Sequence, residues 1–268
     1  LSGTNTFTGG VDLRAGTLNI NNAQALGTSA GTFTVGGAGN AVIIDNTSGS
    51  PISTVNYPMA LNDNFTFTGT NNLNLGAGAV SISADRQLTV TANTLTIGGT
   101  ISASTINLTK TGAGTLSLGS NAATLNDLTI SAGTFTSTSS NLNLAGNYSN
   151  GGTFTNNSGT VVFNGTTQQS IGGTNASTFA NLTLSNSAGL SLSNIDATVT
   201  GTLNFSSGTI TTSTNRVILG TAGSAGTITR TSGHVNGNLR RYVTNGSAQT
   251  VLYTIGDATN YTPASIAF

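Results

Sequence analysis

The chain has 268 residues, of which seven are basic and seven acidic, so its net charge is zero and only 5% of its residues are charged. So few Lys and Arg residues argue against nucleic-acid binding, which depends on clustered positive charge. The absence of Cys excludes disulfides and thiolate metal sites, and no apolar run reaches the roughly 18 residues that a transmembrane segment needs as a helix.

Short strands of period two follow one another along the whole chain. Thr, Val, Ile and Phe favour strands, and strong helix formers are scarce, with no Glu, one Met and a single Lys. Successive strand residues point to opposite faces, so apolar residues should face inward and the neighbouring Thr outward. Thr-Phe-Thr steps occur at 6–8, 32–34, 66–68, 134–136 and 153–155, and other alternations at 88–91, 95–97, 106–109, 116–118, 142–144, 161–163, 182–184, 190–192 and 199–205.

The spacing of turns predicts a parallel β-helix, a solenoid of three short strands per coil. Gly-Gly, Asn-Gly and Ser-Gly steps separate the strands, whereas a β-sandwich would need two-residue hairpins with clear antiparallel turn signals. At about 20–24 residues per coil we expect roughly a dozen coils, and at ~4.8 Å per coil a rod about 50–60 Å long. The pattern is interrupted over 45–65, and the part 45–58, which contains Pro51 and Pro58, is expected to form a long loop leaving the rod.

The last part of the chain, 226–268, differs in composition from the rest. It holds three of the six Arg residues, three of the five Tyr residues and the only His, and its segments 249–253 and 264–268 have the pattern of strands. We expect the β-helix over 1–225 and a C-terminal β cap, junction or subunit contact over 226–268. Arg and Tyr are enriched at interface hot spots, so the candidate self-association residues are Arg240, Arg241, Tyr242, Tyr253 and Tyr261, with a solvated cap face as the alternative.

Two stretches of the chain resemble a known repeat. Residues 1–27 read LSGTNTFTGGVDLRAGTLNINNAQALG, and residues 108–118 read LTKTGAGTLSL. The first resembles the autotransporter-associated β-strand repeat, and the second resembles the opening of that repeat without its following "TYTGG" step. The segments 231–242 and 256–263 resemble parts of large secreted surface proteins of Bacteroidota-like bacteria. The resemblance implies a right-handed parallel β-helix, export from the cell, and no catalytic residue.

No cluster of side chains predicts catalysis or metal binding. The seven acidic residues are all Asp and are spread singly along the chain, whereas general acid–base catalysis needs two titratable groups near one substrate. Asp residues one coil apart could still meet, so a glycan-cleaving β-helix stays open, although turn capping by Asp is the simpler interpretation. His234 has no Cys, Glu or second His to join it. We therefore expect no enzymatic activity, no catalytic residue, no metal site and no cofactor.

Two binding functions stay open as alternatives. Glycan binding commonly uses exposed aromatic side chains, and because the chain lacks Trp, Tyr57 and Tyr148 are the isolated candidates. Ice binding would need Thr at one fixed position on consecutive coils. The Thr-Phe-Thr steps are irregularly spaced along the chain, so Thr side chains that simply face outward are the simpler interpretation.

The main prediction is a structural role outside the cell. We expect a secreted bacterial protein of the cell surface or of an extracellular filament, serving as an adhesin stalk or a filament subunit. Low charge reduces the repulsion that keeps proteins apart, which favours a homo-polymer or contact with further modules of the same chain; cell-surface or glycan contacts are further expected partners. The chain begins inside a repeat and lacks an initiating Met. We therefore expect a piece of a larger protein, or a subunit whose open edge a neighbour completes by β-pairing.

Overall fold

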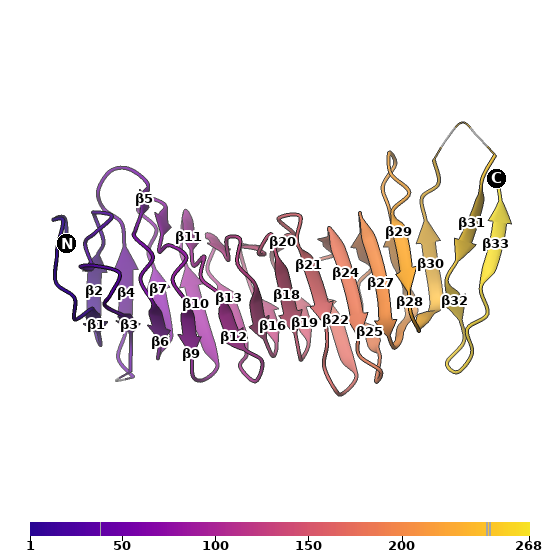
Figure 1. Ribbon diagram of the computed structural model, residues 1–268, viewed down its shortest axis with the longest axis horizontal. Helices are drawn as coiled ribbons and strands as arrows, with labels where there is room; N and C mark the ends of the chain where they lie inside the picture. Colours follow the sequence, from indigo (N-terminus) through magenta and orange to yellow (C-terminus); the bar gives the residue numbers. More distant parts are fainter. Residues whose placement is uncertain (38, 245, 247) are drawn as a thin grey trace.

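The computed structural model describes residues 1–37, 39–244, 246 and 248–268 and forms an elongated all-β rod (Figure 1). The described residues contain strands and turns and no helix. Parallel strands stack into a β-solenoid of about 12 turns, so the predicted β-helix of roughly a dozen coils is confirmed. The two termini lie at opposite ends of the rod, because each coil adds one layer along the axis.

Sheet 1 takes one strand from each successive coil, and its neighbouring strands are parallel. The strands are, in order, β1 (Val11–Leu13), β3 (Phe33–Val35), β6 (Met59–Leu61), β9 (Val80–Ile82), β12 (Ile101–Ala103), β15 (Ala123–Leu125), β18 (Asn141–Leu144), β21 (Thr160–Phe163), β24 (Asn181–Ser185), β27 (Thr202–Ser207) and β29 (Thr227–Arg230).

Sheet 2 forms the second side of the coils and is also parallel. Its strands along the rod are β2 (Gly16–Asn19), β4 (Val42–Asp45), β7 (Phe65–Phe67), β10 (Arg86–Val90), β13 (Leu108–Thr111), β16 (Leu128–Ile130), β19 (Tyr148–Asn150), β22 (Gln169–Gly173), β25 (Leu190–Leu192), β28 (Thr209–Leu219), β30 (His234–Arg241) and β32 (Ile255–Gly256).

Sheet 3 is shorter and forms the third side of the coils between residues 52 and 155. Its parallel strands are β5 (Ile52–Ser53), β8 (Leu73–Asn74), β11 (Thr94–Thr96), β14 (Thr115–Ser117), β17 (Thr134–Thr136) and β20 (Thr153–Thr155). Beyond β20 two further strands, β23 (Ser177–Phe179) and β26 (Ala197–Val199), pair with each other and then with β28. The long strand β28 pairs with β25 through its first residues and with β26 through its last, which merges the second and third sides.

Parallel pairing continues into the C-terminal part of the chain. Strands β29 and β30 pair with β27 and β28, and β32 pairs with β30. The two remaining strands, β31 (Thr250–Tyr253) and β33 (Ala264–Ala267), pair with each other in antiparallel orientation at the C-terminal end of the rod (Figure 1). Both strands predicted near the C-terminus are therefore confirmed.

Coil length varies because the turns vary while the strands stay in register. From Ala123 to its partner Leu142 a coil takes 19 residues, and from Phe33 to its partner Met59 it takes 26. The coil from Phe33 to Met59 includes 45–58, which was predicted to leave the rod as a long loop. That prediction is wrong for β5, which lies in the segment and pairs with the next coil, whereas 46–51 and 54–58 on either side of it form no strand.

The inward side chains form an apolar core along the rod. In sheet 3 one inward column is made of Leu73, Leu95, Leu116, Phe135 and Phe154, all of them buried. The rings of Phe135 and Phe154 stack with centroids 6.3 Å apart. Burial of apolar surface stabilises the fold by about 25 cal/mol per Å², so this column ties each coil to the next. The predicted inward placement of apolar residues is confirmed for these strands.

Three aromatic residues depart from their predicted exposure. Tyr57 and Tyr148, proposed as exposed glycan contacts, are buried. The Tyr57 hydroxyl donates to the carbonyl oxygen of Gly27 at 2.9 Å, and the Tyr148 hydroxyl lies 2.7 Å from the Ser177 hydroxyl. Phe7, predicted to face inward, is instead 42% exposed, because 6–8 form no strand near the start of the chain.

Candidate functional site

Asp and Asn side chains form a ladder along one corner of the rod, at the entry to sheet 2. The Asp85 carboxylate accepts the backbone N–H of Asn107 at 2.8 Å, and the Asn107 side-chain oxygen accepts the N–H of Asp127 at 3.1 Å. Asp127 and Asn147 repeat the contact toward the next coils. Each side chain thus satisfies a backbone donor one coil further on, which supports the prediction that these Asp residues cap turns.

This ladder borders a shallow open groove lined with polar side chains, among them Asn64, Gln87 and Arg86. The two carboxylates of the groove, Asp85 and Asp127, belong to the same column but are separated by Asn107. Both already accept backbone hydrogen bonds. Within the described residues no group of three or more His, Cys, Asp or Glu side chains is placed to hold a metal ion. The groove offers hydrogen-bonding groups to a polar ligand rather than a paired acid and base.

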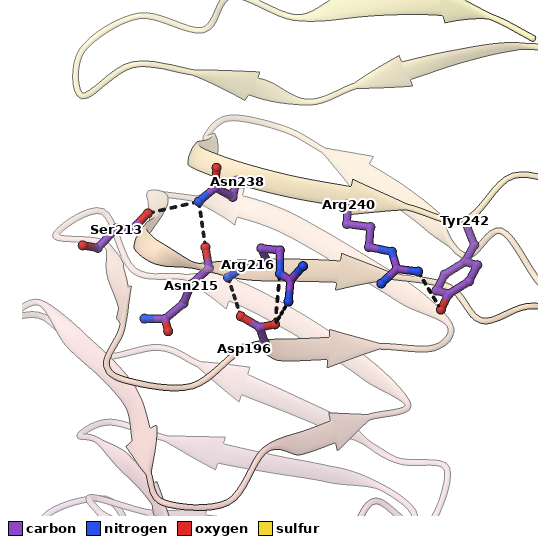
Figure 2. A network of polar contacts seen from close by, with 7 residues as sticks. All are labelled: Asp196, Ser213, Asn215, Arg216, Asn238, Arg240 and Tyr242. Carbon is purple, nitrogen blue, oxygen red and sulfur yellow. Dashed lines mark hydrogen bonds and ion pairs between the residues drawn. The ribbon is translucent and has the colours of Figure 1, made fainter.

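The candidate self-association residues divide into three separate contacts. Arg240 lies over the ring of Tyr242, with its guanidinium carbon 4.8 Å from the ring centroid, and donates to the Tyr242 hydroxyl at 3.1 Å (Figure 2). Arg241 turns toward β31 and donates to the carbonyl oxygen of Leu252 at 2.6 Å. Tyr253 lines a hollow beside Arg240. The five residues are therefore near the same end of the rod but form no single cluster.

Tyr261 belongs to the third contact, together with two residues that were not candidates. The guanidinium of Arg230 lies 3.7 Å above the Tyr261 ring, and the His234 ring lies beside it with centroids 5.9 Å apart. The His234 Nε2 atom is 2.7 Å from the carbonyl oxygen of Asp257. His234 is buried, so it braces the turn that carries Tyr261 instead of facing a substrate.

The network around β28 and β30 contains the ion pair of Arg216 and Asp196 (Figure 2). Arg216 contacts the Asp196 carboxylate through two nitrogens, at 2.9 and 3.1 Å, and its backbone N–H donates to the same carboxylate at 2.8 Å. The Asn238 side chain donates to the carbonyl oxygens of Ser213 and Asn215. These contacts hold the sharp bend of β28, where Ser213 has a positive φ of 51°, against the following coil.

Sheet 3 places hydroxyl side chains in register on four consecutive coils. Strands β11, β14, β17 and β20 pair in order without a shift. Each presents its first and third residues outward and buries the middle one, a Leu or a Phe. The outward residues form two ranks: Thr94, Thr115, Thr134 and Thr153, and beside them Thr96, Ser117, Thr136 and Thr155. We call these eight residues the hydroxyl face.

The regularity of the hydroxyl face was missed in the sequence for a physical reason. Two of the four strands are Thr-Phe-Thr steps, whereas the others read Thr-Leu-Thr and Thr-Leu-Ser, so the aromatic residue is not part of the pattern. The four first residues are 21, 19 and 19 positions apart, and turns of unequal length hide the alignment. Aligning the strands by their buried middle residue would have found it, because inward residues must stack in a solenoid.

One buried charge lies outside these surfaces. The ammonium of Lys110, the single lysine, is fully buried and donates to the carbonyl oxygens of Gly112 at 2.6 Å and Ala132 at 3.0 Å. Burial lowers the pKa of Lys110 from 10.5 to about 8. With two carbonyls as its partners and no exposed surface, it is a structural rather than a catalytic group.

Among the described residues, the structure contains no helix able to cross a membrane. Comparisons of the chain with protein-family models, with curated proteins and with solved structures find no match.

Proposed function

We propose that the chain is a structural part of a secreted bacterial surface protein, used as a stalk or as a segment of an extracellular filament. The observation that carries the proposal is the continuity of bonding from coil to coil. Backbone ladders run along each side of the rod, and the Asp and Asn ladder adds side-chain bonds between the same layers. A solenoid held in this way acts through its length and surface.

Export to the cell surface is supported by the resemblance of residues 1–27 and 108–118 to the autotransporter-associated β-strand repeat. Expression of the chain in its bacterium with an epitope tag, followed by protease treatment of intact cells, tests this part. Loss of the tag from intact cells supports surface display. A tag protected until the cells are lysed contradicts it.

Electron microscopy of the negatively stained protein tests the structural proposal directly. Rods or fibres of constant width support it, and compact particles contradict it. A stalk must also resist load, so pulling single molecules by the two termini should show unfolding in successive steps, as expected when neighbouring coils are the cooperative units. A single collapse at low force would contradict a mechanical role.

The partner we propose is a second copy of the chain, joined end to end. Large hydrophobic residues that stay exposed in the described part of the chain are Leu1 and Phe7 near one end and Leu252, Ile266 and Phe268 near the other. Charge also differs along the rod: residues 1–189 carry three basic and five acidic side chains, and residues 190–268 carry four basic and two acidic ones. Opposite net charge on these two parts favours head-to-tail contact, and exposed apolar surface is what the contact would bury.

The test of end-to-end contact is sedimentation of the whole chain at increasing concentration, in low and high salt. We expect oligomers that weaken as salt rises. The double variant Leu252→Thr and Ile266→Thr should remove them, and so should deletion of residues 249–268. Ile43→Thr, a half-buried outward position of β4, is the matched control. A monomer at all concentrations, or equal loss in the control, contradicts end-to-end contact and leaves the stalk proposal intact.

A glycan-binding β-helix is the second candidate, and the polar groove beside Asp85 and Asp127 is the observation that favours it. A polysaccharide panel tests this reading with the variant Gln87→Ala, which removes an exposed amide of the groove. Binding that the variant lowers supports a glycan site, and cleavage of any polysaccharide would support the catalytic version. No binding across the panel rejects both.

A further inference from the structure

We propose that the hydroxyl face of sheet 3 is a binding surface for ice. This goes beyond the structural role, because a rod can serve as a stalk whatever its side carries. Strands β11 and β20 mark the ends of the four-coil stretch in Figure 1. The proposal rests on the register, on the chemistry of the hydroxyl groups and on the lack of charge there.

The register makes the face a two-dimensional grid. Strands in a sheet lie about 4.7–4.9 Å apart, and alternate residues of a strand are about 6.6–6.8 Å apart. Pairing of Thr115 with Thr134, and of Thr134 with Thr153, keeps the first rank straight. The second rank runs beside it through Thr136 and Thr155. Ice surfaces also present oxygen atoms on a regular grid with repeats close to these two spacings, so the hydroxyl groups can occupy or bridge lattice positions.

The hydroxyl groups of the face are available to water. Among the described contacts, Ser117 accepts a hydrogen bond from the N–H of Gly119, at 3.4 Å, and no Thr hydroxyl of the face has a hydrogen-bond partner within the described protein. None of them is a buried polar atom left without a partner. Each Thr therefore offers a hydroxyl to a water molecule and, beside it, a methyl group that makes no hydrogen bond. This mixture orders water without holding the strong hydration shell of a charged group.

The surroundings keep the face flat. No charged residue occurs in the six strands of sheet 3. The residues just before β14, β17 and β20 are Gly114, Gly133 and Gly152, where a side chain would collide with the preceding coil: a Cβ atom at Gly152 would lie 2.4 Å from the carbonyl oxygen of Gly133. No side chain therefore projects beside β14, β17 and β20 at this edge, and the residue before β11, Asn93, turns its side-chain amide toward the carbonyl oxygens of Gly69 and Thr70 in the preceding coil. Underneath, the stacked rings of Phe135 and Phe154 fill the core.

Other outward surfaces of the rod lack this combination. The corresponding outward column of sheet 1 mixes Asp12, Ala60, Asn143 and Val162 with Thr residues. The outward side of sheet 2 borders the carboxylates of the polar groove. An ice surface carries no net charge and has a regular two-dimensional lattice. Of the three sides of the rod, the hydroxyl face of sheet 3 matches it best, because this face is uncharged and regular.

The experiment is incorporation of the purified full chain into a slowly growing ice crystal, together with inhibition of ice recrystallisation. The wild type should be enriched in the ice fraction, whereas a non-binding protein is left in the liquid. Thr134→Lys, at the centre of the face, should lose that enrichment because a long charged side chain lifts the lattice away. Thr124→Lys is the matched control, since Thr124 is also half-buried and outward but lies on sheet 1 of the same coil. It should keep the enrichment, and circular dichroism checks that both variants fold.

The conservative variant Thr134→Ser keeps the hydroxyl and should retain part of the enrichment. Exclusion of the wild type from ice, together with no effect on recrystallisation, overturns the proposal. An equal loss of enrichment in ice for Thr134→Lys and Thr124→Lys also overturns the proposal, because the hydroxyl face would then bind ice no better than sheet 1. If Thr134→Lys instead abolishes a dimer and the wild type stays out of ice, the face is a contact between copies of the chain and the proposal is wrong.

Discussion

The buried Lys110 should make the stability of the rod depend on pH in an unusual direction. Its side chain lies in the inward column between Leu88 and Ile130 and has no exposed surface. Burial lowers its pKa from 10.5 to about 8, so between these two pH values the unfolded chain binds a proton that the folded chain does not. Stability then rises with pH across this window.

The size of the effect follows from the shift. A shift of about 2.5 units corresponds to about 3.4 kcal/mol of penalty for the charged group. Below about pH 8 Lys110 is charged in both the folded and the unfolded chain, and the full penalty lowers the unfolding free energy. At pH 10 only about 0.8 kcal/mol of the penalty is left, because folded Lys110 is then neutral. The wild type should therefore gain about 2.5 kcal/mol of unfolding free energy from pH 7 to pH 10, relative to a variant with no ionisable group at this position.

Lys110→Met provides that variant, because it keeps the length of the side chain and removes the charge. Urea unfolding of both proteins at pH 7, 8, 9 and 10 gives the difference in unfolding free energy. Burial also raises the pKa values of Tyr57 and Tyr148, but both proteins share this contribution and it cancels. Thr109→Met, an outward substitution on the same strand, should follow the wild type. A difference that stays constant from pH 7 to pH 10 would refute the assigned penalty.

Three further changes test the contacts that hold the coils together. Phe154→Ala should lower the unfolding free energy in urea by about 3–5 kcal/mol, because it opens a cavity in the buried column. Asn107→Ala should lower it by about 0.5–1.5 kcal/mol, since the partly buried N–H of Asp127 loses its acceptor; an unchanged urea midpoint would argue against the ladder as a stabilising element. Asp196→Asn should lower it by less than about 1 kcal/mol, because the ion pair with Arg216 is partly exposed, and the effect should shrink in high salt.

Period two in the sequence was enough to predict the solenoid and the inward side of its strands. In 108–111 the alternation puts Lys110 in phase with Leu108, and the structure follows that phase even though the residue is charged. Composition would have placed the lysine outside. The alternation of the strand decides the position of Lys110, because a shift of one residue that placed Lys110 outside would also turn Leu108 out of the core. Two nearby carbonyl oxygens accept hydrogen bonds from the buried ammonium and so offset part of its cost.

Side-chain partners were the part that the sequence could not supply. Tyr148 looks isolated in the chain, yet its ring packs between Phe154 and Phe179 from the same and the following coil. Phe154 is 6 residues from Tyr148 and Phe179 is 31 residues from it, and the larger separation depends on the lengths of the turns between the strands. The Arg and Tyr residues near the C-terminus were predicted from composition alone. Arg240 and Arg241 have different partners in the structure, because neighbouring residues of a strand face opposite sides.

The hydroxyl face shows why regular surfaces can hide in an irregular chain. Hydrogen bonding between parallel strands forces the buried Leu95, Leu116, Phe135 and Phe154 into one column, and the residues on either side of each must then align as well. Turns carry no such constraint, so their lengths vary and break the period of the sequence without disturbing the surface. In such chains the strands should be aligned by their buried residues, because the register between neighbouring strands is constant. Spacing along the chain is not constant, since the turns differ in length.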